Sequence, residues 1–69
     1  MSIQSLFGHN VRLTREKNGW SQDRLSEESD LHRTYISGIE RGVRNPTITI
    51  VQKLALALGV SVVDLFQDQ

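Results

Sequence analysis

The residues best suited to chemistry stand at the start of a short helical pattern that begins near position 32. Arg33 can donate two parallel hydrogen bonds to O6 and N7 of guanine, which discriminates between bases by ~1–3 kcal/mol. Thr34 can place its methyl group on a thymine methyl, or its hydroxyl on a base or a phosphate. Ser37 and Gly38 follow one turn later, and the glycine leaves room for the helix to lie close to DNA. The pattern predicts a helix that reads base edges, with a solvated Arg33 and a merely structural Thr34 as open alternatives.

Neighbouring residues are suited to the DNA backbone, and such contacts position a protein without reading its sequence. Tyr35 can point its phenol at a phosphate, although a buried structural role is an equal alternative. Arg44 and Asn45 follow in a loop, from which each can reach a phosphate or a base. His32 stands at the start of the same helical pattern. Gln22 begins the preceding pattern, where free backbone N–H groups favour a phosphate.

The charge balance is neutral but unevenly distributed. The 69 residues carry eight Lys and Arg against eight Asp and Glu. Three of the eight basic residues, Arg33, Arg41 and Arg44, fall between positions 32 and 46 together with one acid, Glu40. A strong nucleic-acid binder is usually basic overall, but a neutral total still permits a basic face.

Catalytic and metal chemistry have little support in the sequence. The chain has no cysteine, which excludes a disulfide framework and a Cys-based metal site. His9 and His32 are the only histidines, and no nucleophile–base–acid or metal-ligand spacing surrounds them. We expect no enzymatic activity, no metal and no cofactor.

Apolar periodicity predicts five short helices around one core, and hence a single all-α domain over residues 1–69. The expected helices run from Ile3 or Ser5 to Asn18, from the Ser21 N-cap to Ser29, from His32 or Arg33 to Arg41, from Ile48 to Leu58, and from Val62 to Phe66. The second and third helices form a helix-turn-helix over about residues 21–41.

Capping residues set the predicted helix boundaries. Ser21 and Thr47 can accept hydrogen bonds from free backbone N–H groups at two helix starts. The glycines at positions 19, 42 and 59 are expected to end helices, because glycine adopts the left-handed conformation without a Cβ penalty. Asp30 is expected to have a positive φ in the turn. Ser61 and Asp64 fit a capping box for the last helix.

Dimerisation would stabilise a domain this small, which buries only a modest share of its surface. The helix over residues 48–58 is apolar on more than one side, so it is either the central core helix or part of a subunit contact. The candidate dimer face consists of Ile50, Val62, Val63, Leu65 and Phe66. An equal alternative places all of these residues in the core.

No stretch of the sequence predicts a membrane segment. The apolar-rich stretch over residues 48–63 is interrupted by polar residues and falls short of the ~20 apolar residues that span a bilayer. The first five residues carry no basic cluster ahead of an apolar run, so no signal peptide is expected. Because no effector domain follows the motif, we also expect no small-molecule ligand.

Several short pieces of the chain form one ordered series. They are Val11-Arg12, Arg15-Glu16, Gly19-Trp20-Ser21-Gln22, Tyr35-Ile36-Ser37, Ile39-Glu40-Arg41-Gly42, Arg44-Asn45-Pro46-Thr47, Leu54-Ala55-Leu56-Ala57-Leu58-Gly59-Val60 and Asp64-Leu65-Phe66. Each piece alone is a weak signal, but the complete series resembles the helix-turn-helix domain of phage repressors, Cro proteins and the bacterial regulators of the XRE family. Within that family, the string from Leu31 to Ser37 with Glu40-Arg41 and Arg44-Asn45 is most similar to controller proteins of restriction–modification systems.

The resemblance implies a five-helix, lambda-repressor-like fold and a sequence-specific transcription regulator of double-stranded DNA. Such a regulator is expected to bind an inverted repeat as a homodimer in the cytoplasm of a bacterium, or as a phage protein. The resemblance also implies that Gln22 binds the DNA backbone and braces Arg33, and that Arg12 or Arg15 forms a structural ion pair with Glu40.

The chain departs from the family pattern at four positions. Thr14 stands in place of an apolar residue, Ser26 in place of alanine and Asp30 in place of the turn glycine. His32 replaces the Ser, Thr or Asp expected at an N-cap. These changes affect local stability rather than the fold. The alternative function is a protein-interaction or antitoxin module on the same fold, which Arg33 at the helix start disfavours.

Overall fold

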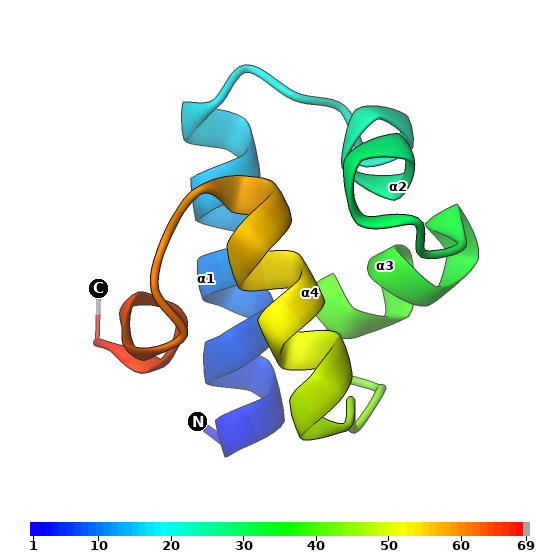
Figure 1. Ribbon diagram of the computed structural model, residues 1–69. Helices are drawn as coiled ribbons and strands as arrows, with labels where there is room; N and C mark the ends of the chain where they lie inside the picture. Colours follow the sequence, from blue (N-terminus) through cyan, green and yellow to red (C-terminus); the bar gives the residue numbers. More distant parts are fainter. Residues whose placement is uncertain (69) are drawn as a thin grey trace.

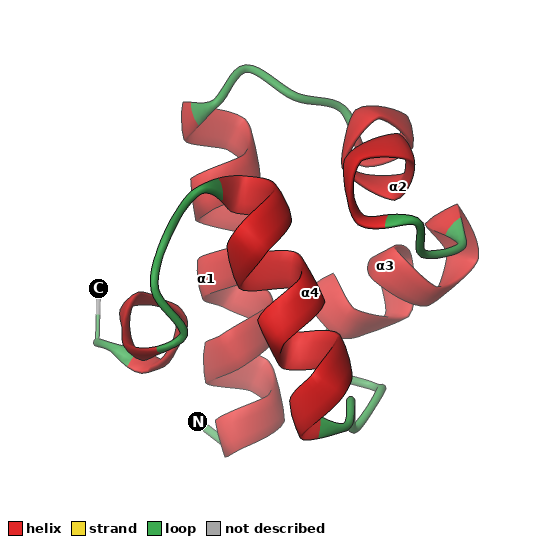
Figure 2. Cartoon of the chain, in the orientation of Figure 1, coloured by secondary structure: helices red, strands yellow, loops and turns green. Residues whose placement is uncertain are grey.

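Four α-helices and one short 3-10 turn make up the protein in the computed structural model, which describes residues 1–68 (Figures 1 and 2). The helices are α1 (Ile3–Lys17), α2 (Gln22–Ser29), α3 (Arg33–Glu40) and α4 (Ile48–Leu58), and the turn is η1 (Val63–Phe66). Residues 1–68 contain no strand. The all-α prediction is confirmed, whereas the expected count of five helices is wrong.

The fifth expected helix is a single 3-10 turn, which begins at a capping box and ends where Asn10 binds the chain that follows. Ser61 and Asp64 form the predicted capping box: the Asp64 N–H donates to Ser61 Oγ at 3.1 Å, and the Ser61 N–H donates to Asp64 Oδ2 at 3.0 Å. Beyond the turn, Asn10 Nδ2 donates to the carbonyl oxygens of Leu65 at 3.0 Å and Gln67 at 2.7 Å. Gln67 is extended, with φ −87° and ψ 146°, so the helix does not continue.

The remaining boundaries lie within one residue of those predicted. α4 occupies the expected range, and Thr47 Oγ1 accepts a hydrogen bond from the Ile50 N–H at 3.3 Å. α1 and α3 each end one residue earlier than expected, which is within the usual variation at a frayed helix end. Asp30 has φ 58° and ψ 33°, so its predicted left-handed conformation is confirmed. Within residues 1–68, no helix has the length and apolar character needed to cross a membrane.

Every element contributes apolar side chains to one core. α1 packs against α3 and η1, and α2 packs against α3 and α4. In Figure 1, η1 lies on the side of α1 away from α2 and α3. The buried apolar residues are Phe7, Val11, Leu25, Ile36, Ile39, Val51, Leu54, Ala55, Leu58 and Leu65.

α1 and α3 meet backbone to backbone at Gly8. A Cβ atom at this position would lie 2.0 Å from the carbonyl oxygen of Ile39, so only glycine fits. The close contact fixes the end of α3 against α1. The first turn of α3 is left at the surface, where it is available to a partner.

Candidate nucleic-acid interface

The start of α3 presents three of the predicted contact residues to solvent. His32, Arg33 and Thr34 are exposed, whereas Ile36 and Ile39 of the same helix are buried. His32 is a working N-cap, because its Nδ1 accepts a hydrogen bond from the Thr34 N–H at 3.2 Å. A capped helix whose first side chains are free of the core can enter the major groove of DNA.

Arg44 covers the part of α3 that was expected to lie open at Gly38. Gly38 is buried, and a Cβ atom there would lie 2.8 Å from Arg44 Cγ. The guanidinium carbon of Arg44 lies 5.7 Å from the centroid of the Tyr35 ring, within cation–π range. Arg44 therefore occupies the space at Gly38 that was expected to let DNA lie close to α3. Ser37 is half-buried beside it, and Asn45 is exposed in the loop.

The first two residues of α2 have partners that differ from the prediction. Gln22 Nε2 donates to Glu40 Oε1 at 3.0 Å, so its expected bracing of Arg33 is wrong. Arg33 pairs instead with Asp23, with Arg33 Nε 2.9 Å from Asp23 Oδ1. The sequence does not predict this pair, because a spacing of ten residues across a turn does not reveal which side chains meet.

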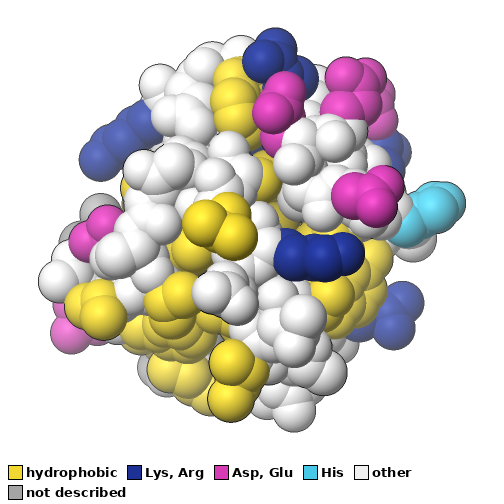
Figure 3. All heavy atoms as spheres, viewed as in Figure 1, with side chains coloured by type: hydrophobic (Ala, Val, Ile, Leu, Met, Phe, Trp, Pro, Cys, Tyr) yellow, Lys and Arg dark blue, Asp and Glu magenta, His cyan; other side chains and the backbone are white. Residues whose placement is uncertain are grey.

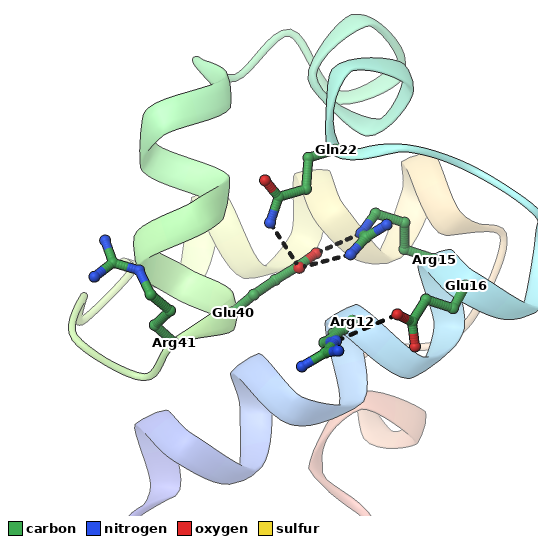
Figure 4. A pocket seen from close by; sticks show the side chains of 6 residues that line it. All are labelled: Arg12, Arg15, Glu16, Gln22, Glu40 and Arg41. Atoms are coloured by element: carbon green, nitrogen blue, oxygen red, sulfur yellow. Dashed lines mark hydrogen bonds and ion pairs between the residues drawn. The ribbon is translucent and has the colours of Figure 1, made fainter.

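The expected ion pair between α1 and Glu40 is confirmed, and its partner is Arg15 (Figure 4). Arg15 Nε donates to Glu40 Oε2 at 2.7 Å and Arg15 Nη2 donates to Glu40 Oε1 at 2.9 Å. Arg15 Nη1 also donates to the carbonyl oxygen of Trp20 at 2.8 Å. The hydrogen bond to Glu40 raises the pKa of the Arg15 guanidinium above its usual value. Arg12 pairs with Glu16 at the surface, at 3.3 Å.

The side chains around this ion pair line a pocket of about 240 Å³. The pocket lies between α1, the start of α2 and the end of α3, and its lining residues are Arg12, Arg15, Glu16, Gln22, Glu40 and Arg41. The lining residues include three arginines and two glutamates, so the lining carries a net positive charge. Arg41 points away from Glu40 in Figure 4 and is exposed. Within residues 1–68 its charge is not paired with a carboxylate.

The candidate dimer residues separate into buried and exposed groups. Leu65 is completely buried in the core and unavailable to a partner, so its assignment to a dimer face is wrong. Ile50 and Phe66 are partly buried against the core, and the Phe66 ring stacks on a phenylalanine ring of α1 with 5.1 Å between centroids. Val62 and Val63 are 39% and 65% exposed, so they can contact a partner.

Two exposed apolar residues of α4 were missing from that set. Ile48 is 87% exposed and Leu56 is 74% exposed. Eight residues place these two side chains about 80° apart around α4, and Ile48 points closer to the direction of the buried Ala55, so spacing alone does not identify them as exposed. Figure 3 shows apolar side chains over α4 and the C-terminal turn, while acidic side chains gather over α2. In this view the apolar side chains of α4 and the C-terminal turn thus lie on a different part of the surface from the acidic side chains of α2.

Known proteins share this arrangement of helices over most of the chain. The family model described as Helix-turn-helix matches residues 11–65. Control protein C.BamHI of Bacillus amyloliquefaciens is 51% identical over 65 residues, which cover 93% of this chain and 80% of that protein. Control protein C.SmaI of Serratia marcescens is 45% identical over 69 residues, which cover 100% of this chain and 82% of that protein. The solved tetramer of the restriction–modification controller protein C.Esp1396I, in complex with its natural 35-base-pair operator, has a TM-score of 0.87 at 38% identity, covering 96% of this chain and 87% of that one.

Proposed function

We propose, since this chain belongs to the helix-turn-helix family of DNA-binding transcription regulators, that it regulates transcription by binding an inverted-repeat operator as a homodimer. The observation that carries the proposal is the capped and exposed start of α3, where Arg33 and Thr34 lie clear of the core. In helix-turn-helix regulators the second helix of the motif lies in the major groove of DNA. In this chain Arg33 and Thr34 then supply the groups that distinguish bases.

Each contact has a physical role in this proposal. Arg33 reads guanine and Thr34 contacts a thymine methyl or a neighbouring phosphate. The first backbone N–H groups of α2 have no partner within the helix, so a phosphate binds there beside Gln22. Arg44 is held over the Tyr35 ring next to α3, and its positive charge contacts the DNA backbone there.

Dimerisation uses the exposed apolar surface. Its residues are Ile48 and Leu56 of α4 with Val62 and Val63 before and within η1, whereas Leu65 belongs to the core. Two-fold symmetry then places the two copies of α3 in successive major grooves, about 34–36 Å apart. A single α3, the helix that reads DNA, contacts only a few base pairs. A second copy of the chain is therefore needed to recognise a specific operator.

The finer proposal is a controller protein of a restriction–modification system, acting in the bacterial cytoplasm. It is supported by the identity to control proteins C.BamHI and C.SmaI, which extends over nearly the whole chain. The string from Leu31 to Ser37, which forms the start of the recognition helix, also favours this subtype.

Selection of bound duplexes from a randomised pool, at fixed near-physiological salt, tests the proposal. Salt must be constant because phosphate-driven affinity falls steeply as it rises. We expect enrichment of an inverted repeat. If the folded protein enriches no sequence, DNA reading is contradicted and the protein-interaction module on the same fold becomes the better interpretation.

A second measurement on the enriched duplex tests the role of Arg33. Arg33→Ala should abolish the preference at one base pair per half-site and cost ~1–3 kcal/mol there. Lys53→Ala is the matched control, because Lys53 is an exposed cation on α4 and should leave the base preference unchanged. A uniform loss across all sequences would identify Arg33 as a phosphate contact instead.

A further inference from the structure

The Arg33–Asp23 ion pair joins the first residue of α3 to the first turn of α2. Arg33 Nε lies 2.9 Å from Asp23 Oδ1, and the two side chains are 59% and 74% exposed. Among residues 1–68, the other cations around the start and end of α3, Arg41 and Arg44, form no ion pair with an acid. Arg33 is therefore the interface cation whose charge is already neutralised before DNA arrives.

The position of the carboxylate matters as much as the pairing. Asp23 lies in the first turn of α2, beside the N–H groups that the proposed function assigns to a phosphate. The partial positive charge of those N–H groups favours the carboxylate whether or not Arg33 accompanies it. While Arg33 stays with Asp23, the pair has no net charge and displaces no counterion from DNA.

The exposed ion pair is also weak enough to exchange. Pairs that water reaches contribute little free energy, because the solvent screens the charges and both side chains lose freedom. A guanine offers Arg33 two parallel acceptors, which is a better partner than the single Nε–Oδ1 contact. Other bases at that position offer no equivalent pair of acceptors.

We propose, on the basis of the DNA-binding function above, that Asp23 is a specificity-determining residue. It competes with DNA phosphates for Arg33 on non-operator DNA and yields it most readily to guanine. The carboxylate thus lowers affinity for random sequence more than affinity for the operator, and it does so through Arg33 rather than by contacting a base.

Asp23→Asn tests this mechanism, because asparagine keeps the shape of the side chain and removes its charge. Freed Arg33 should make one additional phosphate contact on random duplex. The salt dependence of random-duplex binding should therefore steepen by ~0.9 in the slope of log K against log salt. One such contact corresponds to about fivefold tighter random-duplex binding near 0.15 M salt. Operator affinity should change by a smaller factor, so the operator-to-random ratio falls.

Glu27→Gln is the charge-matched control on the same helix. Glu27 is exposed and forms no ion pair within residues 1–68, so its removal reports only the general effect of one lost negative charge. A double-mutant cycle with Arg33→Ala separates the mechanisms further. In the Arg33→Ala background, Asp23→Asn should leave the operator-to-random ratio unchanged.

The outcomes are distinct. A lower operator-to-random ratio that disappears without Arg33 supports the proposal. Equal effects of Asp23→Asn and Glu27→Gln on the operator-to-random ratio, or a fall in that ratio that persists in Arg33→Ala, would overturn it while leaving DNA binding intact. Failure of the wild-type chain to bind either duplex would overturn the proposed function itself.

Discussion

Replacing Glu40 with glutamine should remove a large part of the folding stability. The change leaves the Arg15 guanidinium without its counter-charge. Water cannot replace that charge well, because the Arg15 and Glu40 side chains are only 11% and 4% exposed. Breaking a buried ion pair by removing one partner costs ~3–5 kcal/mol. Because the amide oxygen of the introduced side chain can still accept from Gln22 and Arg15, we expect the lower end of that range, about 3 kcal/mol.

That loss is large for a domain of this size. At ~0.05–0.15 kcal/mol per residue, the whole chain has a stability of roughly 3–10 kcal/mol. With a shift of ~4–8 °C per kcal/mol for a domain of this length, the melting temperature should fall by about 12–24 °C.

Urea denaturation monitored by the fluorescence of Trp20, the only tryptophan, measures the loss directly. Glu16→Gln is the matched control: its partner Arg12 and Glu16 itself are 61% and 49% exposed, so the cost should stay below ~1 kcal/mol. Equal costs of Glu40→Gln and Glu16→Gln would show that burial does not make the Arg15–Glu40 pair more important for stability than the exposed pair. An Arg15→Met, Glu40→Leu double variant should recover much of the stability, because apolar replacement removes both charges together.

Three other substitutions test separate features of the fold. Gly8→Ala should cost about 3 kcal/mol in urea unfolding, because its Cβ would meet the Ile39 carbonyl oxygen at 2.0 Å; near-wild-type stability would contradict the close packing. Asn10→Ala should cost ~1–3 kcal/mol and accelerate hydrogen exchange at the Leu65 amide, since two carbonyl oxygens lose their donor; unchanged exchange would show that the Asn10 side chain does not hold η1. Asp30→Gly should stabilise the protein by up to ~1 kcal/mol by relieving a left-handed backbone, and a loss of stability would argue against that strain.

Local signals in the sequence were sufficient to predict most of the fold. The range of α4 follows from the Thr47 cap, the apolar repeat and Gly59, which all lie within the helix or beside it. The left-handed turn at Asp30 follows from the residue types that tolerate positive φ. The exposed start of α3 follows from its polar residues in the same way.

Features that depend on distant contacts could not be predicted from the sequence. Arg12 and Arg15 are one turn apart on α1, and only the packing of α3 decides which of them reaches Glu40. Asn10 resembles a surface residue in the sequence, yet it is buried because a segment 55 residues later folds over it. The same fold-back places Leu65 in the core rather than at a dimer contact.

The sequence predicted which residues belong to the candidate site, but not which side chains they contact. Arg33 is exposed as expected, but its pairing with Asp23 depends on how α2 and α3 cross. Gly38 was expected to leave space for DNA, and the loop that follows α3 fills that space with Arg44. Side-chain neighbours across a turn are set by tertiary geometry, which residue spacing alone does not encode.

The bonds from Asn10 to the C-terminal segment have a consequence for the order in which the molecule opens. They close loops of 55 and 57 residues, whereas α2 and α3 meet across a turn of three residues. Closure entropy grows with loop length, so we expect this long-range attachment to form late in folding and to open before the contact between α2 and α3. Its release exposes Leu65 and the α1 surface beneath it, next to the valines assigned to the dimer contact. Association of two copies would hold that end closed, so dilution should loosen the C-terminal end before it disturbs the helix that reads DNA.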